Sequence, residues 1–191
     1  MRTSLVPAIR PLVALVASAA LVGSLAAPAR AAATTDTDAT GDAVTSSGST
    51  SPNNQTADIT SIAVTHGTSA VKVVVTLRDV DADNWNLVTA IRTPKSNYEV
   101  LLAKLSGTKY AVLSRKGTAI TCKAMDTRIE DTPNTLYVYV PRSCLGRPAS
   151  VRVGAVMTAK QGNTAVSDDA RLNGALTSSG KPKLGPSVKA G

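Results

Sequence analysis

The stretch TLYVYVPRSC, residues 135–144, carries the most regular strand pattern of the chain and one of its two cysteines. Aliphatic residues at positions 136, 138 and 140 alternate with Tyr137 and Tyr139. This period of two predicts a β-strand with an aliphatic face that packs on a core. Pro141 has no backbone N–H to give to a neighbouring strand, so we expect regular pairing to end there, just before Cys144.

The same period recurs along the chain. VKVVVTLR at residues 71–78 alternates aliphatic and polar side chains, and DITSIAVT at residues 58–65 precedes it across a short turn. Further strand-like runs, separated by turns rich in Gly, Pro, Asn and Ser, occupy residues 86–93, 97–105, 109–115, 118–125 and 150–159. About eight short strands at this spacing, without a sustained helical period, predict an all-β fold, an antiparallel β-sandwich.

The beginning of the 191-residue chain is typical of a secretory signal peptide. Arg2 and Arg10 precede an uncharged apolar run, and Ala29-Arg30-Ala31 offers a cleavage site with small residues on both sides. We expect removal of residues 1–31, which takes away three arginines and lowers the net charge from +8 to +5. The mature protein is then secreted and extracellular, without a membrane span, because no later run is long and apolar enough to cross a bilayer.

Composition divides the mature chain into three parts. Residues 32–57 are rich in Thr, Ser, Gly, Asp and Asn, which predicts a flexible polar leader. Residues 58–176 hold the alternating runs and form the expected β-sandwich domain. Residues 177–191 are polar and interrupted by Gly and Pro, so we expect a flexible tail.

The two cysteines, Cys122 and Cys144, lie 22 residues apart in a chain with an export signal, which favours one disulfide. A hairpin in which Glu130 faces Thr135 brings Cys122 within one residue of Cys144. We therefore expect a β-bulge at residues 141–142 that supplies the missing residue. A reactive thiol is the alternative, but the chain has no C-x-x-C and a single histidine to lower a thiol pKa.

The net charge is concentrated in residues 84–191, which carry sixteen basic against six acidic residues. Such a surface suits an anionic partner such as a wall polymer, although singly spread charges are also ordinary solvated surface. Nucleic acid is not an expected partner. Its binding needs aromatic stacking surfaces beside the charge, and the chain is 3% aromatic with no Phe.

Two acidic stretches suit calcium, a cation that prefers several oxygen ligands. DTDATGD carries Asp38 and Asp42, and DVDADN carries Asp79, Asp81 and Asp83. The alternative is acidic decoration of loops that aids solubility. No other cofactor or metal is expected from the sequence.

Three aromatic residues are candidates for ligand binding. Trp85 follows the acidic loop, and Tyr137 and Tyr139 share the face of their strand opposite the aliphatic residues. Exposed rings on a sheet can stack on sugars or on partner proteins. The alternative is that these rings pack on cross-strand neighbours or a second sheet.

No catalytic residues are predicted. The chain has one histidine, no G-x-S-x-G and no glycine-rich phosphate loop. Asp168 and Asp169 are adjacent, and neighbouring residues of a strand point to opposite faces, so they are poorly placed to act as a pair. We do not expect an enzyme.

Several motifs occur in a familiar order: Asp38-x-x-Gly41-Asp42, ADITSIAVTHG (57–67), NLVTAIRTPKSNYEV (86–100), VPRSCLGRPASVRVG (140–154) and SDDAR (167–171). In that order the chain resembles a group of exported actinobacterial β-sandwich proteins, from Asp38 to Arg171. More loosely, residues 38–77 are similar to the opening of DOMON and family-9 carbohydrate-binding modules. That resemblance implies a sandwich, and members of those families bind sugars, haem or calcium. The Met/His pair of a haem site is not evident, since His66 is the only histidine.

These observations predict a secreted, non-catalytic binding module for a glycan or cell-wall polymer. The alternative is an extracellular protein–protein interaction or inhibitor module. Both follow from an exported sandwich without a recognisable active site.

Overall fold

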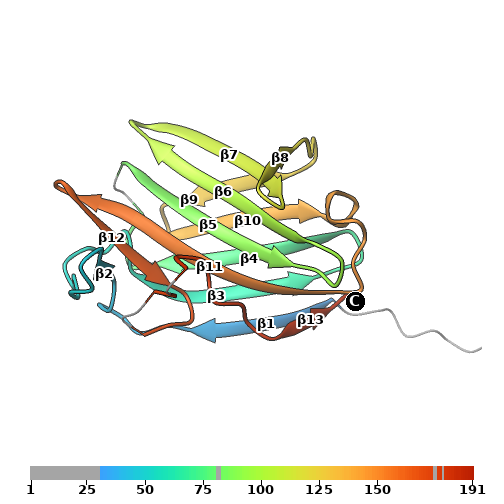
Figure 1. Cartoon of the computed structure of the whole chain (residues 1–191), viewed down its shortest axis with the longest axis horizontal. Helices are drawn as coiled ribbons and strands as arrows, with labels where there is room; N and C mark the ends of the chain where they lie inside the picture. The colour runs from blue at the N-terminus through green and yellow to red at the C-terminus, as the bar shows by residue number, and fades with distance from the viewer. Residues whose placement is uncertain (1–30, 81–82, 174–175, 178) are drawn as a thin grey trace, which may run out of the picture.

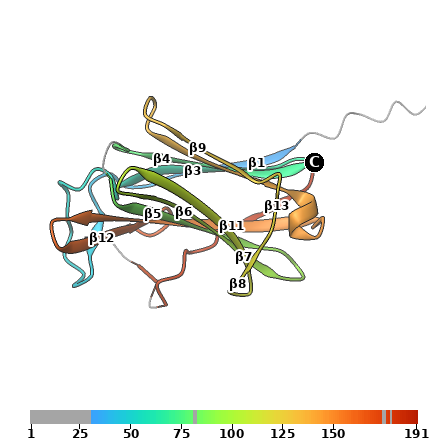
Figure 2. The same ribbon diagram turned by 90° about the horizontal axis from the view of Figure 1, so that it is seen from above.

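The computed structural model describes residues 31–80, 83–173, 176–177 and 179–191. Two antiparallel sheets pack face to face, so the predicted all-β sandwich is confirmed (Figures 1 and 2). The expected signal peptide lies outside the described residues, apart from Ala31. Within the described part of the chain, no helix combines the length and apolarity that a membrane crossing requires.

The first sheet has five strands in the order β1-β3-β4-β10-β9, all antiparallel to their neighbours. Its strands are β1 (Ala32–Thr37), β3 (Ile59–His66), β4 (Ala70–Leu77), β9 (Asp126–Glu130) and β10 (Thr135–Pro141). The expected strands at 58–65, 71–78 and 135–140 therefore become β3, β4 and β10.

The second sheet follows the order β2-β12-β11-β5-β6-β7-β8, and β13 pairs with the beginning of β11. Its strands are β2 (Val44–Thr45), β5 (Trp85–Arg92), β6 (Asn97–Leu105), β7 (Thr108–Arg115), β8 (Thr118–Ile120), β11 (Ser150–Gln161), β12 (Thr164–Asp169) and β13 (Ser187–Lys189). β12 lies beyond the runs that the sequence predicted. The expected strand at 118–125 is shortened to β8.

The core lies between the sheets and follows the alternation of the sequence. Leu136, Val138 and Val140 of β10 are fully buried, whereas Tyr139 on the other face of the strand is exposed. Leu102 of β6 and Met157 of β11 belong to the opposing layer of the same core. The period of two thus sets both the strands and the face of each strand that carries the core.

The predicted disulfide between Cys122 and Cys144 is confirmed, with an S–S distance of 2.01 Å. The hairpin register is also as expected, with Glu130 opposite Thr135. The expected β-bulge at residues 141–142 is wrong. Pro141 still pairs with β4, and the chain then coils into the 3-10 helix η1 (Arg142–Leu145), which brings Cys144 to its partner.

The structure differs from the sequence-based expectation at both ends of the domain. Within the expected leader, β1 pairs with β3 and β2 pairs with β12. Within the expected tail, β13 pairs with β11, and Val188 is buried in the core. Backbone ladders hold these polar segments, and such pairing needs no apolar side chain on the outer face.

A glycine in β11 lets the C-terminal segment cross the second sheet at short range. A Cβ built on Gly154 would lie 2.1 Å from the carbonyl oxygen of Lys183. The backbone N–H of Gly185 donates to the carbonyl of Val153, 2.9 Å away. Close packing of this segment therefore depends on the missing side chain at position 154.

Candidate functional site

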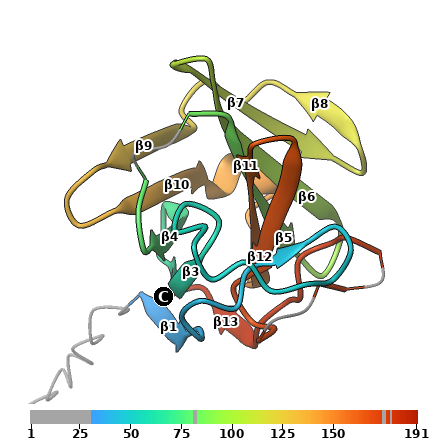
Figure 3. The ribbon, with the colours of Figure 1, turned by 90° about the vertical axis from the view of Figure 1, so that its left-hand side faces the viewer.

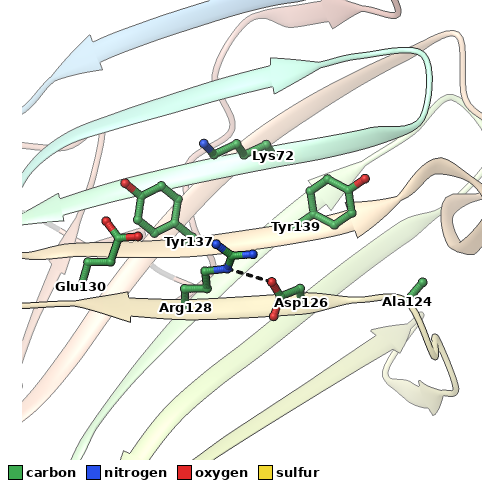
Figure 4. Close-up of a pocket in the computed structure, with 7 residues that line it drawn as sticks. All are labelled: Lys72, Ala124, Asp126, Arg128, Glu130, Tyr137 and Tyr139. Carbon is green, nitrogen blue, oxygen red and sulfur yellow. Dashed lines mark hydrogen bonds and ion pairs between the residues drawn. The ribbon is translucent and has the colours of Figure 1, made fainter.

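A groove of about 400 Å³ crosses the outer face of the first sheet (Figure 4). It combines two tyrosines of β10 with charged side chains from the strands on either side. We call it the tyrosine groove; its lining residues are Lys72, Ala124, Asp126, Arg128, Glu130, Tyr137 and Tyr139. The structure thus brings the two predicted tyrosines together in one surface feature.

The strand register explains this composition. Tyr137 lies opposite Arg128 on β9, and Tyr139 lies opposite Asp126. On the other side, Lys72 of β4 is the cross-strand partner of Tyr139. Directly opposed residues share a face of the sheet, so all five side chains project from the outer face.

Contacts between these side chains orient the groove. The Lys72 ammonium lies 4.8 Å from the centre of the Tyr137 ring, a cation–π distance. The Arg128 guanidinium donates to the Asp126 carboxylate at 3.0 Å. Desolvation raises the pKa of the Tyr137 hydroxyl, and the neighbouring Glu130 carboxylate raises it further. The groove therefore offers aromatic faces, hydrogen-bond donors and acceptors side by side.

Trp85 does not belong to this or any other exposed surface. Its side chain is 1% exposed at the beginning of β5, where it packs in the core. The expectation that Trp85 contacts a ligand at the surface is wrong. Alternation within β5 explains its burial, because Leu87 and Ile91 share its inward face.

A second constellation joins three aspartates that are far apart in the sequence. A carboxylate oxygen of each of Asp42, Asp58 and Asp168 lies within 4.8 Å of those of the other two. Asp42 belongs to the β1–β2 connection, Asp58 directly precedes β3, and Asp168 lies in β12. We call these three residues the acidic cluster. Figure 3 looks onto the end of the sandwich where β2 and β12 lie.

Backbone and side-chain donors hold two members of the acidic cluster in place. Asp58 Oδ2 accepts hydrogen bonds from the Gly41 N–H at 2.7 Å and from Arg78 at 2.9 Å. Asp168 Oδ2 accepts from the Ile59 N–H at 2.8 Å. Both aspartates are buried, so these donors offset part of the cost of removing the carboxylates from water.

Burial and mutual repulsion change the titration of the cluster. Burial raises the pKa of Asp168 to about 8, and the charges of Asp38, Asp42 and Asp58 add to the increase. Burial likewise raises the pKa of Asp38 to about 7. These carboxyl groups therefore favour a proton, or another positive charge, near neutral pH.

Only some of the aspartates that the sequence suggests as calcium ligands lie close to one another in the structure. Asp42 belongs to the acidic cluster, and Asp38 is close enough to influence its titration. Asp83 is half-exposed and pairs with Lys104 at 3.2 Å. Asp79 is not a member of the cluster, and Asp81 lies outside the described residues.

Sequence reasoning missed Asp58 and Asp168 as members of this site. They are 110 positions apart. Asp58 begins an apolar strand-like run, and Asp168 has only the adjacent Asp169 beside it, so neither position resembles a cation-binding loop. Asp169 points elsewhere, as adjacent positions of a strand predict. It accepts from the Lys183 N–H at 2.8 Å and from the Arg171 N–H at 3.1 Å.

Comparison of the chain with protein-family models, with curated proteins and with solved structures gave no match. The functional argument therefore rests on the tyrosine groove and the acidic cluster.

Proposed function

We propose that the protein is a secreted, non-catalytic binding module whose tyrosine groove binds a glycan of the cell wall. The observation that carries the proposal is the pair Tyr137 and Tyr139, which face outward from one strand into one groove. Residues two apart on a strand are separated by roughly 7 Å. Their rings offer two neighbouring apolar platforms for the flat faces of sugar rings.

The charged residues of the groove supply the polar half of glycan recognition. Lys72 and Arg128 donate hydrogen bonds, and Asp126 and Glu130 accept them, so hydroxyl groups of either role find partners. The cation–π contact of Lys72 and the ion pair of Arg128 with Asp126 already orient these side chains. Side chains that are already oriented lose less conformational entropy when a ligand binds.

The disulfide supports an extracellular setting for this binding. Disulfides persist in oxidising compartments and are rare in the cytosol. The Cys122–Cys144 bond links the loop before β9 to η1, which directly follows the groove strand β10. It therefore braces the two strands that carry most of the groove.

The test is co-sedimentation of the purified mature chain with insoluble wall polysaccharide, followed by calorimetry with soluble fragments of the polymer that sediments it. The variant Tyr137→Ala/Tyr139→Ala should lose about tenfold or more in affinity, since aromatic anchors dominate such interfaces. Tyr110→Ala is the matched control, because Tyr110 is also an exposed tyrosine, 51% accessible, but lies outside the groove. Equal binding by wild type and the double variant contradicts the proposal.

A protein-binding or inhibitor module is the second candidate function. The exposed apolar side chains of β6 and β7 favour it: Leu101, Leu105, Tyr110 and Val112 are 38–51% accessible. Under this alternative, no wall fraction sediments the protein, and Tyr110→Ala weakens capture of a single extracellular protein. The double tyrosine variant of the groove then captures it normally.

A further inference from the structure

We propose that the acidic cluster of Asp42, Asp58 and Asp168 is a binding site for a divalent cation with oxygen ligands, and that the cation is calcium. The cluster is built from other strands than the tyrosine groove. The proposal is therefore independent of glycan binding.

The spacing of the carboxylate oxygens suits this ion. Calcium binds oxygens at roughly 2.3–2.6 Å, so two ligands of one ion are separated by at most about 5 Å. The three carboxylate oxygens lie within 4.8 Å of one another, inside that limit. The cluster contains carboxylates and no thiol or imidazole, and this donor set selects hard cations over zinc or copper.

An unsatisfied buried oxygen is the second, independent observation. Asp58 is fully buried, yet its Oδ1 accepts no hydrogen bond from the described residues. The other oxygen, Oδ2, accepts from both Gly41 and Arg78. Buried polar atoms nearly always have a partner, and a bound ion is one explanation of an apparent exception. Asp38 Oδ2, beside the cluster, is a second buried oxygen without a hydrogen bond in the described structure.

The negative charge in and beside the acidic cluster also favours a bound cation. Arg78 is ion-paired with Asp58. Across the described ranges, no ion pair joins Asp38 or Asp168 to a basic side chain. A buried carboxylate without a counter-charge is costly, and a divalent cation offsets that cost for several carboxylates at once.

A bound cation at this position would join segments from both sheets. Asp58 leads into β3 of the first sheet, and Asp168 belongs to β12 of the second. Asp42 lies in the connection from β1 to β2, which passes from one sheet to the other. The ion would therefore fasten the N-terminal segment across the end of the sandwich, and its binding energy would add to the free energy of unfolding.

The experiment compares the mature chain, stripped of metal with a chelator, before and after addition of CaCl₂ or MgCl₂. Calorimetry should show one Ca²⁺ bound per chain, and saturating calcium should raise Tm by roughly 5–10 °C. Asp168→Asn should abolish both effects. Asparagine keeps an oxygen acceptor for the Ile59 N–H, so this variant is expected to fold. Asp42→Asn, at a half-buried position, provides a second test with less risk to folding.

The matched control is Asp83→Asn, which also removes one negative charge but acts at an exposed ion pair with Lys104. It should bind calcium as the wild type does. Three results overturn the proposal: no heat and no change in Tm for the wild type with calcium, an equal response in Asp168→Asn and wild type, or an equal response to magnesium and calcium. In chelator, Asp168→Asn should be at least as stable as the wild type, which separates a lost site from a damaged fold.

Discussion

The buried imidazole of His66 donates from Nδ1 to the carbonyl oxygen of Val188, 3.1 Å away and 122 positions further along the chain. His66 ends β3 in the first sheet, and Val188 is the middle residue of β13 in the second. The backbone carbonyl of His66 also accepts the N–H of Gly191 at 3.0 Å. One histidine thus fastens the C-terminal segment to the opposite sheet.

Protonation of His66 should destabilise the folded protein in acid, because it places a positive charge in the core. Burial lowers the pKa of His66 below its usual value, and the nearby Arg142 charge lowers it further. The unfolded chain then binds the proton more tightly than the folded chain. The contribution of neutral His66 to the free energy of unfolding is fully present above about pH 6.5. Below that pH the free energy of unfolding falls by up to about 1.4 kcal/mol per pH unit, until the pH reaches the pKa of His66 in the folded protein.

The measurement is urea unfolding of wild type and His66→Asn between pH 5 and 8. Asparagine keeps a neutral N–H donor for Val188 but does not titrate. The difference in unfolding free energy between the two proteins should be constant above about pH 6.5 and shrink below it. A difference that stays constant down to pH 5 would show that His66 titrates normally in the folded protein.

The acidic cluster should give the opposite pH dependence once metal is removed. The pKa of Asp168 is raised to about 8, with Asp38, Asp42 and Asp58 as the facing carboxylates. A raised carboxyl pKa means that the folded state holds the proton more tightly, so its stability falls as pH rises towards 8. In chelator, wild type should lose stability relative to Asp168→Asn between pH 6 and 8, by about 1 kcal/mol or more. Parallel pH profiles for the two proteins contradict this prediction.

Loss of the disulfide should destabilise the domain. Cys122 and Cys144 close a loop of 22 residues, which corresponds to about 3 kcal/mol in the chain-entropy model. Cys122→Ala/Cys144→Ala should lower the free energy of unfolding by about that amount. Reductant should lower the wild-type value similarly and leave the double variant unchanged. A reductant effect on the variant would point to a cause other than this bond.

Gly154→Ala should displace the C-terminal segment from β11. The new Cβ would lie 2.1 Å from the Lys183 carbonyl oxygen, and relief requires backbone movement at a cost of about 1–3 kcal/mol. Gly67→Ala is the matched control, because the nearest atom to its Cβ is at an ordinary 3.7 Å. Hydrogen exchange should accelerate at residues 183–189 in the first variant and not in the second. Unchanged protection there would show that this segment accommodates the methyl group.

The sequence predicted those parts of the fold in which apolar side chains alternate. β4 and β10 follow directly from residues 71–78 and 135–140, and the hairpin register placed Cys122 near Cys144. β1 was missed because its sequence AATTDT has no apolar face. Its outer side chains are exposed, and its backbone bonds to β3 require only an open strand edge.

Prediction of the sites was limited by distance along the chain. Tyr137 and Tyr139 were found because two outward residues share one strand. Asp58 and Asp168 come together only through the packing of β3 near β12, and no pattern within a short stretch of sequence indicates that contact. Its place after an acidic loop makes Trp85 a candidate for ligand binding, but the inward alternation of β5 already begins at that residue, so the alternative of a packed ring holds.

β9, whose charges line the tyrosine groove, is also the outermost strand of its sheet. Outermost strands expose backbone groups that can recruit a strand from another molecule and so begin aggregation. Here the ammonium of Lys109, from β7 of the opposite sheet, donates to the Thr127 carbonyl at 2.7 Å, and Asp126 and Arg128 place charges on the same strand. Engineering this surface to accept other ligands by neutralising those charges would therefore reduce colloidal stability as well as change specificity.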